Sequence, residues 1–324
     1  LVSLTPFRSA SILPPTSNEP DVFWLPNRSR SALMTTTSDP KKSIAFQGVL
    51  GANSHMSCQA AYPDMPPLPC ATFDEAFAAV TNGHALFGMI PVENSVMGRI
   101  ADIHHILPDS GLHIVAEHFQ RVNHHLLAIK GATLDGLKTV ESQLPALSQC
   151  RTFIREHGLQ QVTAGDTAGA AKDVAERGDP TVAAIASSLA AEIYGLETLA
   201  SNIEDAEHNT TRFIVMAREP VMPPKDNGTV VTSFVFRVRS VPAALYKALG
   251  GFATNSVNIT KLESYLVDGH FTAAQFYADV EGHPEDGPVK LALEELAFYS
   301  KELKVLGTYP AHPYRLESAS PEES

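Results

Sequence analysis

The chain has 324 residues, of which 44% are hydrophobic and 19% are charged, a composition typical of a globular protein with room for two hydrophobic cores. Its 24 Lys and Arg residues stand against 36 Asp and Glu residues, and the resulting net charge of −12 disfavours binding to nucleic acid or to anionic membrane surfaces. No apolar run approaches the roughly 18 residues that span a bilayer, and the three cysteines form no CxxC motif, which predicts reduced thiols in a cytoplasmic protein.

Residues 1–42 are rich in Ser, Thr and Pro and have no sustained helical or strand period, so we predict a disordered N-terminal extension. Basic residues with few acids leave a transit peptide as an alternative, although a clear amphipathic stretch is missing. The chain starts at Leu1, and Met34 precedes the first predicted strand. We hypothesise that Met34 is the natural start and that residues 1–33 lie upstream of the native protein.

From residue 43 to residue 219, short apolar runs alternate with segments of helical periodicity, and we interpret this stretch as the first large domain. The predicted strands are 44–46, 86–92 with a break at Pro91, 112–116, 125–129, 182–185 and 213–217. The predicted helices are a stretch that ends at Tyr62, then 73–80, 146–157, 167–177 with Thr167 as N-cap, and 187–194. This alternation predicts an α/β fold whose ligands bind at the carboxyl ends of strands.

Prolines and an Asn-Gly pair mark residues 220–228 as a linker to a second domain, residues 229–312. Its predicted strands and helices follow the order βαββαβ, over 230–238, 242–252, 259–267, 271–280, 288–299 and 303–309. Pro242 suits the first position of the first helix, and Asp268-Gly269 is typical of a hairpin turn. The order predicts a ferredoxin-like split βαβ fold, followed by a polar tail at 313–324.

The segment from Asn209 to Phe213 has the most informative chemistry, because it places Thr211 and Arg212 where an acidic loop becomes a buried strand. Arg is the side chain best suited to a fixed, bidentate grip on a carboxylate. A neighbouring Thr can hydrogen-bond a second substrate oxygen. We therefore expect Arg212 to bind a carboxylate despite the negative net charge, with Thr211 beside it.

Four further segments lie at junctions between predicted strands and helices: Gly48–His55, Pro91–Ser95, Asp166–Ala171 and Ala183–Leu196. Taken singly, each is explained by a tight turn, a capped turn or a helix N-cap. The first is not G-x-G-x-x-G, so a dinucleotide site has little support. The histidines include two adjacent pairs but no HExxH spacing, so we expect surface or packing roles and no metal site.

Taken together and in this order, these segments resemble the motifs of prephenate dehydratases, namely G-x-x-G-(T/A)-x-S, P-x-E-N-S, (S/D)-T-x-x-A-A, A-A-I-A-S with Y-G-L, and N-x-T-R-F. The resemblance implies a two-lobed catalytic domain like type II periplasmic binding proteins. It implies that the catalytic residues are Thr211, Arg212, Glu93, Asn94 and Ser95. It implies that substrate is also bound by Ser54, Thr167, Ala168, Ser187, Asn209 and Phe213, with the backbone N–H groups at Thr167 holding a carboxylate.

The second domain resembles an ACT regulatory domain of the phenylalanine-binding type, in which a G-A-L helix start and an E-S-R-P segment line an effector site between paired domains. The residues that this resemblance assigns to the effector site are Ala243, Ala244, Leu245, Asn258, Glu263 and Ser264. Ala243 replaces the family's glycine, and Tyr265-Leu266 replaces Arg-Pro, which puts the strength of phenylalanine control in question. A domain that only mediates dimerisation is the alternative.

The resemblance implies a cytoplasmic prephenate dehydratase that needs no cofactor, is controlled by L-phenylalanine, and forms a homodimer or homotetramer. The implied reaction removes water and carbon dioxide from prephenate and gives phenylpyruvate; Thr211 would donate a hydrogen bond to the departing hydroxyl group. Arogenate is the alternative substrate. A solute-binding protein of the same fold and a catalytically inactive regulatory subunit are the alternatives outside catalysis.

Overall fold

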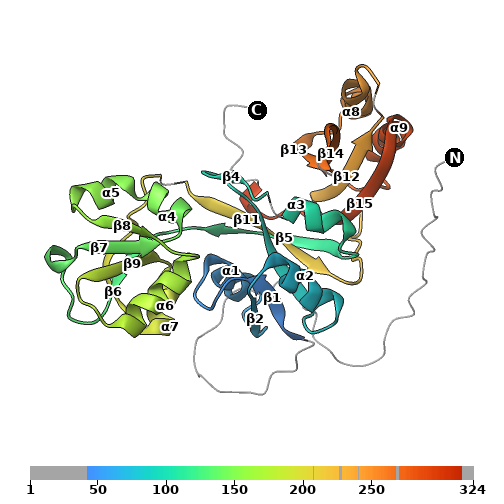
Figure 1. Ribbon diagram of the computed structural model, residues 1–324. Helices are drawn as coiled ribbons and strands as arrows, with labels where there is room; N and C mark the ends of the chain where they lie inside the picture. Colours follow the sequence, from blue (N-terminus) through green and yellow to red (C-terminus); the bar gives the residue numbers. More distant parts are fainter. Residues whose placement is uncertain are drawn as a thin grey trace, which may run out of the picture. The chain divides into compact units, whose positions relative to one another are not determined.

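The computed structural model describes residues 42–315 except Asp102, Glu207, Asp226, Asn227, Ser240, Asp268 and Gly269. Within β13 and β14 it does not describe the side chains of residue 267 and residues 270–273. The predicted N-terminal extension up to residue 41, the proposed start at Met34, the Asp268-Gly269 turn and the tail from residue 316 lie outside the described residues. The described chain forms three sheets, each covered by helices (Figure 1).

The first sheet has the strand order β2-β1-β3-β11-β5, with β4 paired to β3. Its strands are β1 (Ile44–Gln47), β2 (Pro67–Cys70), β3 (Phe87–Asn94), β4 (Gly98–Arg99), β5 (His113–Arg121) and β11 (Thr210–Ala217). The helices of this lobe are α1 (Asn53–Ala61), α2 (Phe73–Thr81), α3 (Ile103–Ile106) and the 3₁₀ turn η2 (Leu107–Asp109). β1 to β3 run parallel, whereas β11 runs antiparallel to both of its neighbours because the chain returns to this sheet from the second lobe.

The second sheet has the order β10-β6-β9-β7-β8. Its strands are β6 (His125–Ala128), β7 (Thr139–Ser142), β8 (Gln160–Thr163), β9 (Val182–Ala186) and β10 (Glu197–Ser201). Its helices are α4 (Leu144–Gln149), α5 (Arg151–Glu156), α6 (Thr167–Arg177) and α7 (Ser188–Tyr194), with the 3₁₀ turn η3 (Leu134–Gly136). One buried cluster lies on each face of this sheet, the first under α4 and α5 and the second under α6 and α7.

Two connecting segments, 122–124 and 202–209, join the two lobes, and they lie side by side. The Val122 amide donates to the Asn209 carbonyl at 2.8 Å, and the Ile203 amide donates to the His124 carbonyl at 3.0 Å. Because these are backbone bonds, the two segments form one ribbon between the lobes.

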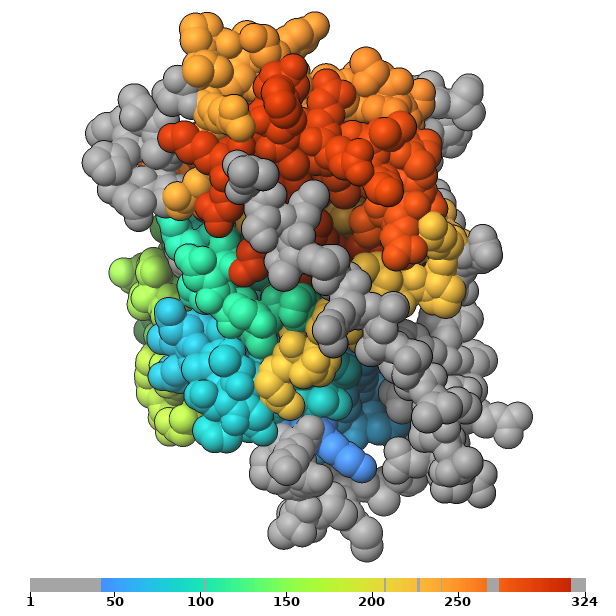
Figure 2. Space-filling model, turned by 90° about the vertical axis from the view of Figure 1, so that its right-hand side faces the viewer, coloured from blue at the N-terminus to red at the C-terminus, as the bar shows by residue number. Residues whose placement is uncertain are grey.

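The third sheet has the order β13-β14-β12-β15, and every neighbouring pair is antiparallel. Its elements are β12 (Val230–Val238), α8 (Ala244–Thr254), β13 (Ile259–Val267), β14 (His270–Glu281), α9 (Gly287–Tyr299) and β15 (Ser300–Pro310), in the predicted order βαββαβ. α8 and α9 cover one face, over a cluster that includes Phe234, Phe252 and Leu296. The orange and red surface in Figure 2 belongs to these elements.

The other face of the third sheet packs against the first lobe. Val235, Tyr277 and Tyr309 belong to the same buried cluster as Ile114 of β5. A Cβ atom on Gly307 of β15 would overlap the carbonyl oxygen of Ile114, so the two backbones approach as closely as they do only because residue 307 is glycine.

Four local predictions are wrong, and each has a physical reason. Pro91 does not interrupt β3, because it pairs with Phe213 beside a register shift that leaves Val92 of β3 as the extra residue, and a bulge is where a strand tolerates proline. The predicted helix 146–157 is two helices that meet at Cys150. The α6 N-cap is Asp166, whose carboxylate accepts from the Gly169 amide at 2.6 Å, and not Thr167.

The fourth error concerns α8, which begins at Ala244 and not at Pro242. Its N-cap, Ala243, has φ 59° and ψ 21°, in the left-handed region that favours glycine. The left-handed conformation of residue 243 separates the proline from the helix. Five strands have no counterpart among the predicted ones: β2, β4, β7, β8 and β10.

Candidate functional site

Two of the chemical motifs meet as neighbouring strands of the first sheet. In the register of β3 and β11, Asn94 lies opposite Thr211, and Glu93 lies opposite Arg212. Successive side chains on a strand point to opposite faces of the sheet. The pair Asn94–Thr211 therefore faces one side and the pair Glu93–Arg212 faces the other.

The amide of Asn94 fixes the hydrogen-bonding role of Thr211. Its Oδ1 accepts from the Val96 and Met97 amides at 3.0 and 2.9 Å, which orients its Nδ2 toward β11. Nδ2 then donates to Thr211 Oγ1 at 3.0 Å and to Asn209 Oδ1 at 2.7 Å. Because the Thr211 oxygen accepts this bond, its own hydrogen remains available for donation to a third group.

A chain of polar side chains continues from Asn209 into the second lobe. Asn209 Nδ2 donates to Gln149 Oε1 at 2.9 Å, and the same oxygen lies 2.7 Å from Nε2 of His124. The Gln149 oxygen is an acceptor, so the His124 Nε2 atom carries the proton. Burial lowers the pKa of His124 below its ordinary value, more than its bond to Gln149 raises it, so its ring is neutral at pH 7. Gln149 has no predicted role, and His124 is one of the histidines predicted to have surface or packing roles.

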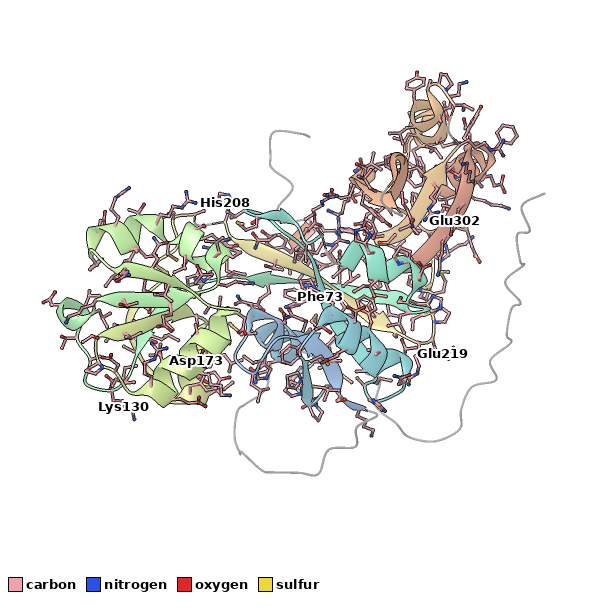
Figure 3. All side chains as sticks on the ribbon, viewed as in Figure 1. Phe73, Lys130, Asp173, His208, Glu219 and Glu302 are labelled. Atoms are coloured by element: carbon pink, nitrogen blue, oxygen red, sulfur yellow. The ribbon has the colours of Figure 1, made fainter. Side chains whose placement is uncertain are left out.

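Ser95 closes the same corner of the sheet. Its hydroxyl donates to the carbonyl of His208 at 2.5 Å and accepts from the Thr210 amide at 2.9 Å. His208 lies where the chain returns from the second lobe to β11 (Figure 3). Ser95 thus holds the start of β11 against the end of β3 and in this conformation is used in backbone bonds.

The opposite face of the strand pair is dominated by Arg212, which is 3% exposed. Its Nε donates to Glu117 at 2.9 Å, its Nη1 donates to Glu93 at 2.9 Å and to Asp279 at 2.6 Å, and its Nη2 donates to the Tyr309 hydroxyl at 2.9 Å. Asp279 and Tyr309 belong to the third sheet. Burial would lower the pKa of Arg212, but Asp279 and its other anionic neighbours raise it well above its ordinary value.

This geometry contradicts the expectation that Thr211 and Arg212 grip one substrate side by side. The guanidinium lies on the far face of β11 from the Thr211 hydroxyl, and three carboxylates already bind it. Phe213 is likewise a core residue at 1% exposure, packed among Phe46 and Met89, so its ring is not open to a substrate.

Glu93, expected to be a cleft carboxylate, is also on the face of Arg212. Its second oxygen accepts from Lys261 Nζ at 2.6 Å, and Lys261 lies on β13 of the third sheet. Burial alone would raise the pKa of Glu93, but Lys261 and Arg212 together hold it below its ordinary value. Glu93 is therefore a carboxylate paired with two cations at pH 7.

At another contact between the lobes, the glycine-rich loop meets α7. Ser187 caps α7 by accepting from the Ala190 amide at 3.1 Å, and its hydroxyl donates to the Gly51 carbonyl. Gly51 has φ +91°, and a Cβ there would lie 2.9 Å from the Ala190 backbone. Ser187 is 1% exposed and already bonded on both sides, so it supports the loop and does not offer a free hydroxyl.

Three helices of the second lobe begin at one edge of its sheet. β7, β8 and β9 run parallel, and α4, α6 and α7 follow them directly, so the helix N-termini gather where Ser187 meets the glycine-rich loop. Such N-termini favour bound anions. Thr167 and Ala168 open α6 at this edge, and Ser54 opens α1 after the loop.

Comparison with known proteins identifies the family. A family model described as prephenate dehydratase matches residues 44–221, more than half of the chain. The chain belongs to the prephenate dehydratase family. It is a carbon–oxygen lyase of the hydro-lyase type, with relatives named for dehydration of prephenate or arogenate.

Three relatives are informative. The chain is 50% identical over 275 residues to a bifunctional N-acyl-homoserine lactone acylase/prephenate dehydratase of Komagataeibacter europaeus, covering 85% of this chain and 98% of that protein. It is 38% identical to arogenate dehydratase/prephenate dehydratase 1 of Arabidopsis thaliana, covering 90% and 78%. A prephenate dehydratase structure from Arthrobacter aurescens in complex with L-Phe has a TM-score of 0.76 at 30% identity, covering 83% and 90%.

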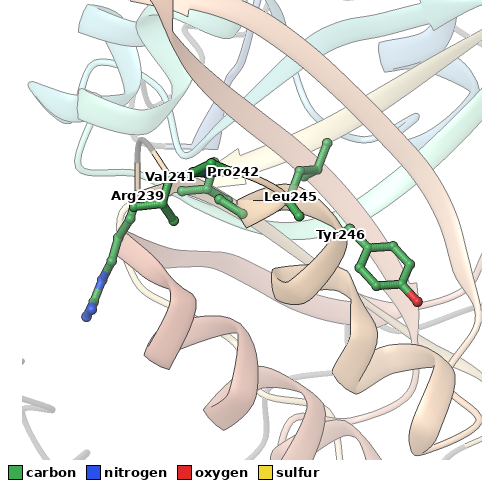
Figure 4. A pocket seen from close by; sticks show the side chains of 8 residues that line it. Arg239, Val241, Pro242, Leu245 and Tyr246 are labelled. Carbon is green, nitrogen blue, oxygen red and sulfur yellow. The ribbon is translucent and has the colours of Figure 1, made fainter.

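In this prephenate dehydratase family member, the residues predicted to bind an effector fall into two groups. Ala243, Ala244 and Leu245 line a surface hollow of about 480 Å³ at the start of α8 (Figure 4). Asn258, Glu263 and Ser264 are not among the residues that line it. Asn258 bonds Glu281, Glu263 bonds Lys261, and the Ser264 carbonyl accepts from Arg99 of β4.

Tyr265, which replaces the arginine of the family's E-S-R-P segment, is a packing residue. It is 8% exposed, and its ring centroid lies 5.5 Å from that of His104 and 5.7 Å from that of His105, both on α3. Burial and the nearby Lys261 lower the pKa of His104 to about 4, so this ring is neutral. The departure from the family pattern thus adds an aromatic contact between β13 and the first lobe.

Within the described residues, no group of three or more His, Cys, Asp or Glu side chains is arranged to hold a metal ion. The same part of the chain contains no helix with the length and apolarity needed to cross a membrane.

Proposed function

We propose that this protein catalyses the decarboxylating dehydration of prephenate to phenylpyruvate. The observation that carries the proposal is the Thr211 hydroxyl, whose oxygen accepts from Asn94 and whose hydrogen is thereby left to donate. The polar chain through Asn209 and Gln149 joins this hydroxyl to the second lobe, so closure of the lobes would adjust its position.

In the proposed reaction, the ring hydroxyl leaves with its bonding electrons while the ring carboxylate departs as carbon dioxide. The electrons of the broken carbon–carbon bond enter the ring, which becomes aromatic, and the hydroxide takes a proton to become water. Thr211 donates a hydrogen bond to the departing oxygen and so stabilises its developing negative charge. Aromatisation drives the reaction, and no step needs a cofactor.

The substrate carries two carboxylates, and the helix N-termini of the second lobe offer a partner for one of them. We assign the pyruvyl carboxylate to the backbone N–H groups at Thr167 and Ala168, at the start of α6. The glycine-rich loop that precedes Ser54 lies at the same edge of the second lobe. Arg212 is not assigned to a carboxylate, because its donors are directed at Glu93, Glu117 and Asp279.

The lobes are proposed to resemble type II periplasmic binding proteins and to close on the substrate. The strand orders β2-β1-β3-β11-β5 and β10-β6-β9-β7-β8, joined by two adjacent connecting segments, support this view. Closure would exclude water and destabilise the ring carboxylate, which favours its loss as carbon dioxide.

We further propose that residues 229–312 form an ACT domain that binds L-phenylalanine. Support comes from the βαββαβ order, from the hollow beside Ala243 and from the relative whose structure was solved in complex with L-Phe. Because Glu263 does not line that hollow, we place the complete effector site between two copies, which requires a homodimer or homotetramer. The three free cysteines fit a cytoplasmic protein.

The test is phenylpyruvate formation from prephenate by purified protein without added metal or cofactor, with arogenate assayed in parallel. Turnover of prephenate that falls by about 10²-fold in Thr211→Ala would support the proposal. Preference for arogenate would reassign the substrate, and absence of turnover with both would leave a binding protein of the same fold.

A second activity, hydrolysis of an N-acyl-homoserine lactone amide, is favoured by one observation. The Komagataeibacter europaeus relative named for this activity is 50% identical and is matched over 98% of its length. The buried thiols are poor candidates for its nucleophile, since burial raises the pKa of Cys58 to about 12. Release of free homoserine lactone in the same preparation, assayed with and without prephenate, tests this activity.

A further inference from the structure

Lys261 connects two motifs that belong to different domains. Its side chain is 8% exposed, and its Nζ lies 2.6 Å from Glu93 and 3.2 Å from Glu263. Glu93 stands in the P-x-E-N-S motif of the first lobe, whereas Glu263 stands in the segment proposed to bind the effector. A single buried ammonium group is thus shared between the catalytic strand pair and the regulatory sheet.

Glu93 is linked to the catalytic hydroxyl by a short path. It precedes Asn94, which holds Thr211, and it pairs with Arg212, which follows Thr211 on β11. A change in the bonds of Glu93 therefore acts on both strands beside the Thr211–Asn94 pair.

An amino acid effector would compete with Lys261 for Glu263. The α-ammonium group of the effector is a cation, and a carboxylate that binds it is less available to the Lys261 ammonium, which the new charge also repels. The bond from Lys261 to Glu263 is the longer of its two bonds, and the lysine stem is flexible. Lys261 would then move fully onto Glu93.

We propose that Lys261 is a positioning residue that transmits effector binding from Glu263 through Glu93 to the Asn94–Thr211 pair. The proposal rests on the proposed dehydratase function and on L-phenylalanine as effector. It predicts that binding and inhibition are separable, because Lys261 carries the signal and does not line the hollow beside Ala243. By reciprocity, substrate binding also changes the affinity for the effector through the same residue.

The test uses the full chain and the variant Lys261→Met, with Lys304→Met as matched control. Lys304 also reaches from the third sheet to the first lobe, where it donates to the carbonyl of Pro108, but it does not contact Glu93. Three quantities are measured: kcat and KM for prephenate, inhibition by L-phenylalanine, and binding of L-phenylalanine by calorimetry.

For Lys261→Met we expect L-phenylalanine to bind at least as tightly as to the parent, because its competitor for Glu263 is gone, while the concentration that halves activity rises at least fivefold, roughly the lower limit of typical allosteric coupling. Lys261→Arg should restore part of the inhibition, and Lys304→Met should be inhibited like the parent. Equal inhibition of Lys261→Met and the parent would overturn the proposal. Absence of prephenate turnover in the parent would overturn the proposed function itself, and absence of L-phenylalanine binding would overturn the effector assignment.

Discussion

Replacement of Arg212 by Met tests whether this residue serves the structure or the substrate. Loss of the guanidinium removes the Nη1 donor that lies 2.6 Å from Asp279. Ser233 still donates to Asp279, and Nη2 of Arg315 lies 3.9 Å from it. Glu117 keeps both of its bonds from Arg315, at 2.6 and 2.9 Å. The variant therefore leaves one fully buried carboxylate without its nearest cation.

Breaking a buried ion pair in this way costs about 3–5 kcal/mol, and we expect the free energy of unfolding of Arg212→Met at pH 7 to fall by about that amount. Urea unfolding followed by circular dichroism measures it. Lys172→Met is the matched control, because the ion pair of Lys172 with Glu176 is exposed, and its loss should cost at most about 1 kcal/mol.

The pH dependence gives a second, independent readout. In the parent, burial would raise the pKa of Asp279, but Arg212 and Ser233 hold it below the unfolded value, so its contribution is present above the unfolded pKa and lost as pH falls. In Arg212→Met the burial effect is largely unopposed, the pKa of Asp279 rises, and stability is lost as pH rises. The difference between parent and variant should therefore be smaller at pH 5 than at pH 7.

The double variant Arg212→Met with Asp279→Asn should recover part of the lost stability, because it removes the buried charge of Asp279. The reasoning would be refuted by an Arg212→Met protein that unfolds within about 1 kcal/mol of the parent and instead shows a large rise in KM for prephenate. That result would mean that the guanidinium binds a substrate carboxylate after all.

Three further changes have defined outcomes. Asn94→Ala should lower kcat about as much as Thr211→Ala, roughly 10²-fold, because both remove the same oriented donor. The double variant should therefore be little worse than either single variant. Steady-state kinetics in which the two losses multiply would contradict this. Ala243→Gly should raise the free energy of unfolding by about 0.5–1 kcal/mol, seen as a higher Tm, because φ 59° suits glycine; an unchanged or lower Tm would count against the strain. Gly307→Ala should lower the Tm markedly, because its Cβ would overlap the carbonyl of Ile114; a Tm equal to that of the parent would show that the close approach is not required.

The elements that the sequence predicted well are those buried on a regular face. α6 was predicted with its observed bounds, as were β12 and β13. Two of the missed strands lack that signal: β8 is exposed at all four positions, and β2 contains two prolines. Edge strands of this kind are specified by pairing with a neighbour, which a single sequence window does not contain.

The candidate site was only partly predictable for a similar reason. The motifs identified Asn94, Thr211 and Asn209, which the structure brings together. Gln149 and His124 join the same chain of hydrogen bonds, but they lie 60 and 85 positions before Asn209 in the sequence, at the end of α4 and in a connecting segment. Nothing near them in the sequence distinguishes them from packing residues.

The alternation of side chains along a strand explains why Arg212 and Thr211, adjacent in the sequence, have different partners in the structure. Adjacent residues in a motif look like one site in the sequence, but on β3 and β11 they belong to opposite faces. Asn94 and Thr211 face the proposed reaction, while Glu93 and Arg212 bind Lys261 and Asp279 of the third sheet. Two paired dipeptides thus place the Thr211 hydroxyl and the contacts with the third sheet one residue apart, so the proposed control of Thr211 by that sheet needs no long pathway.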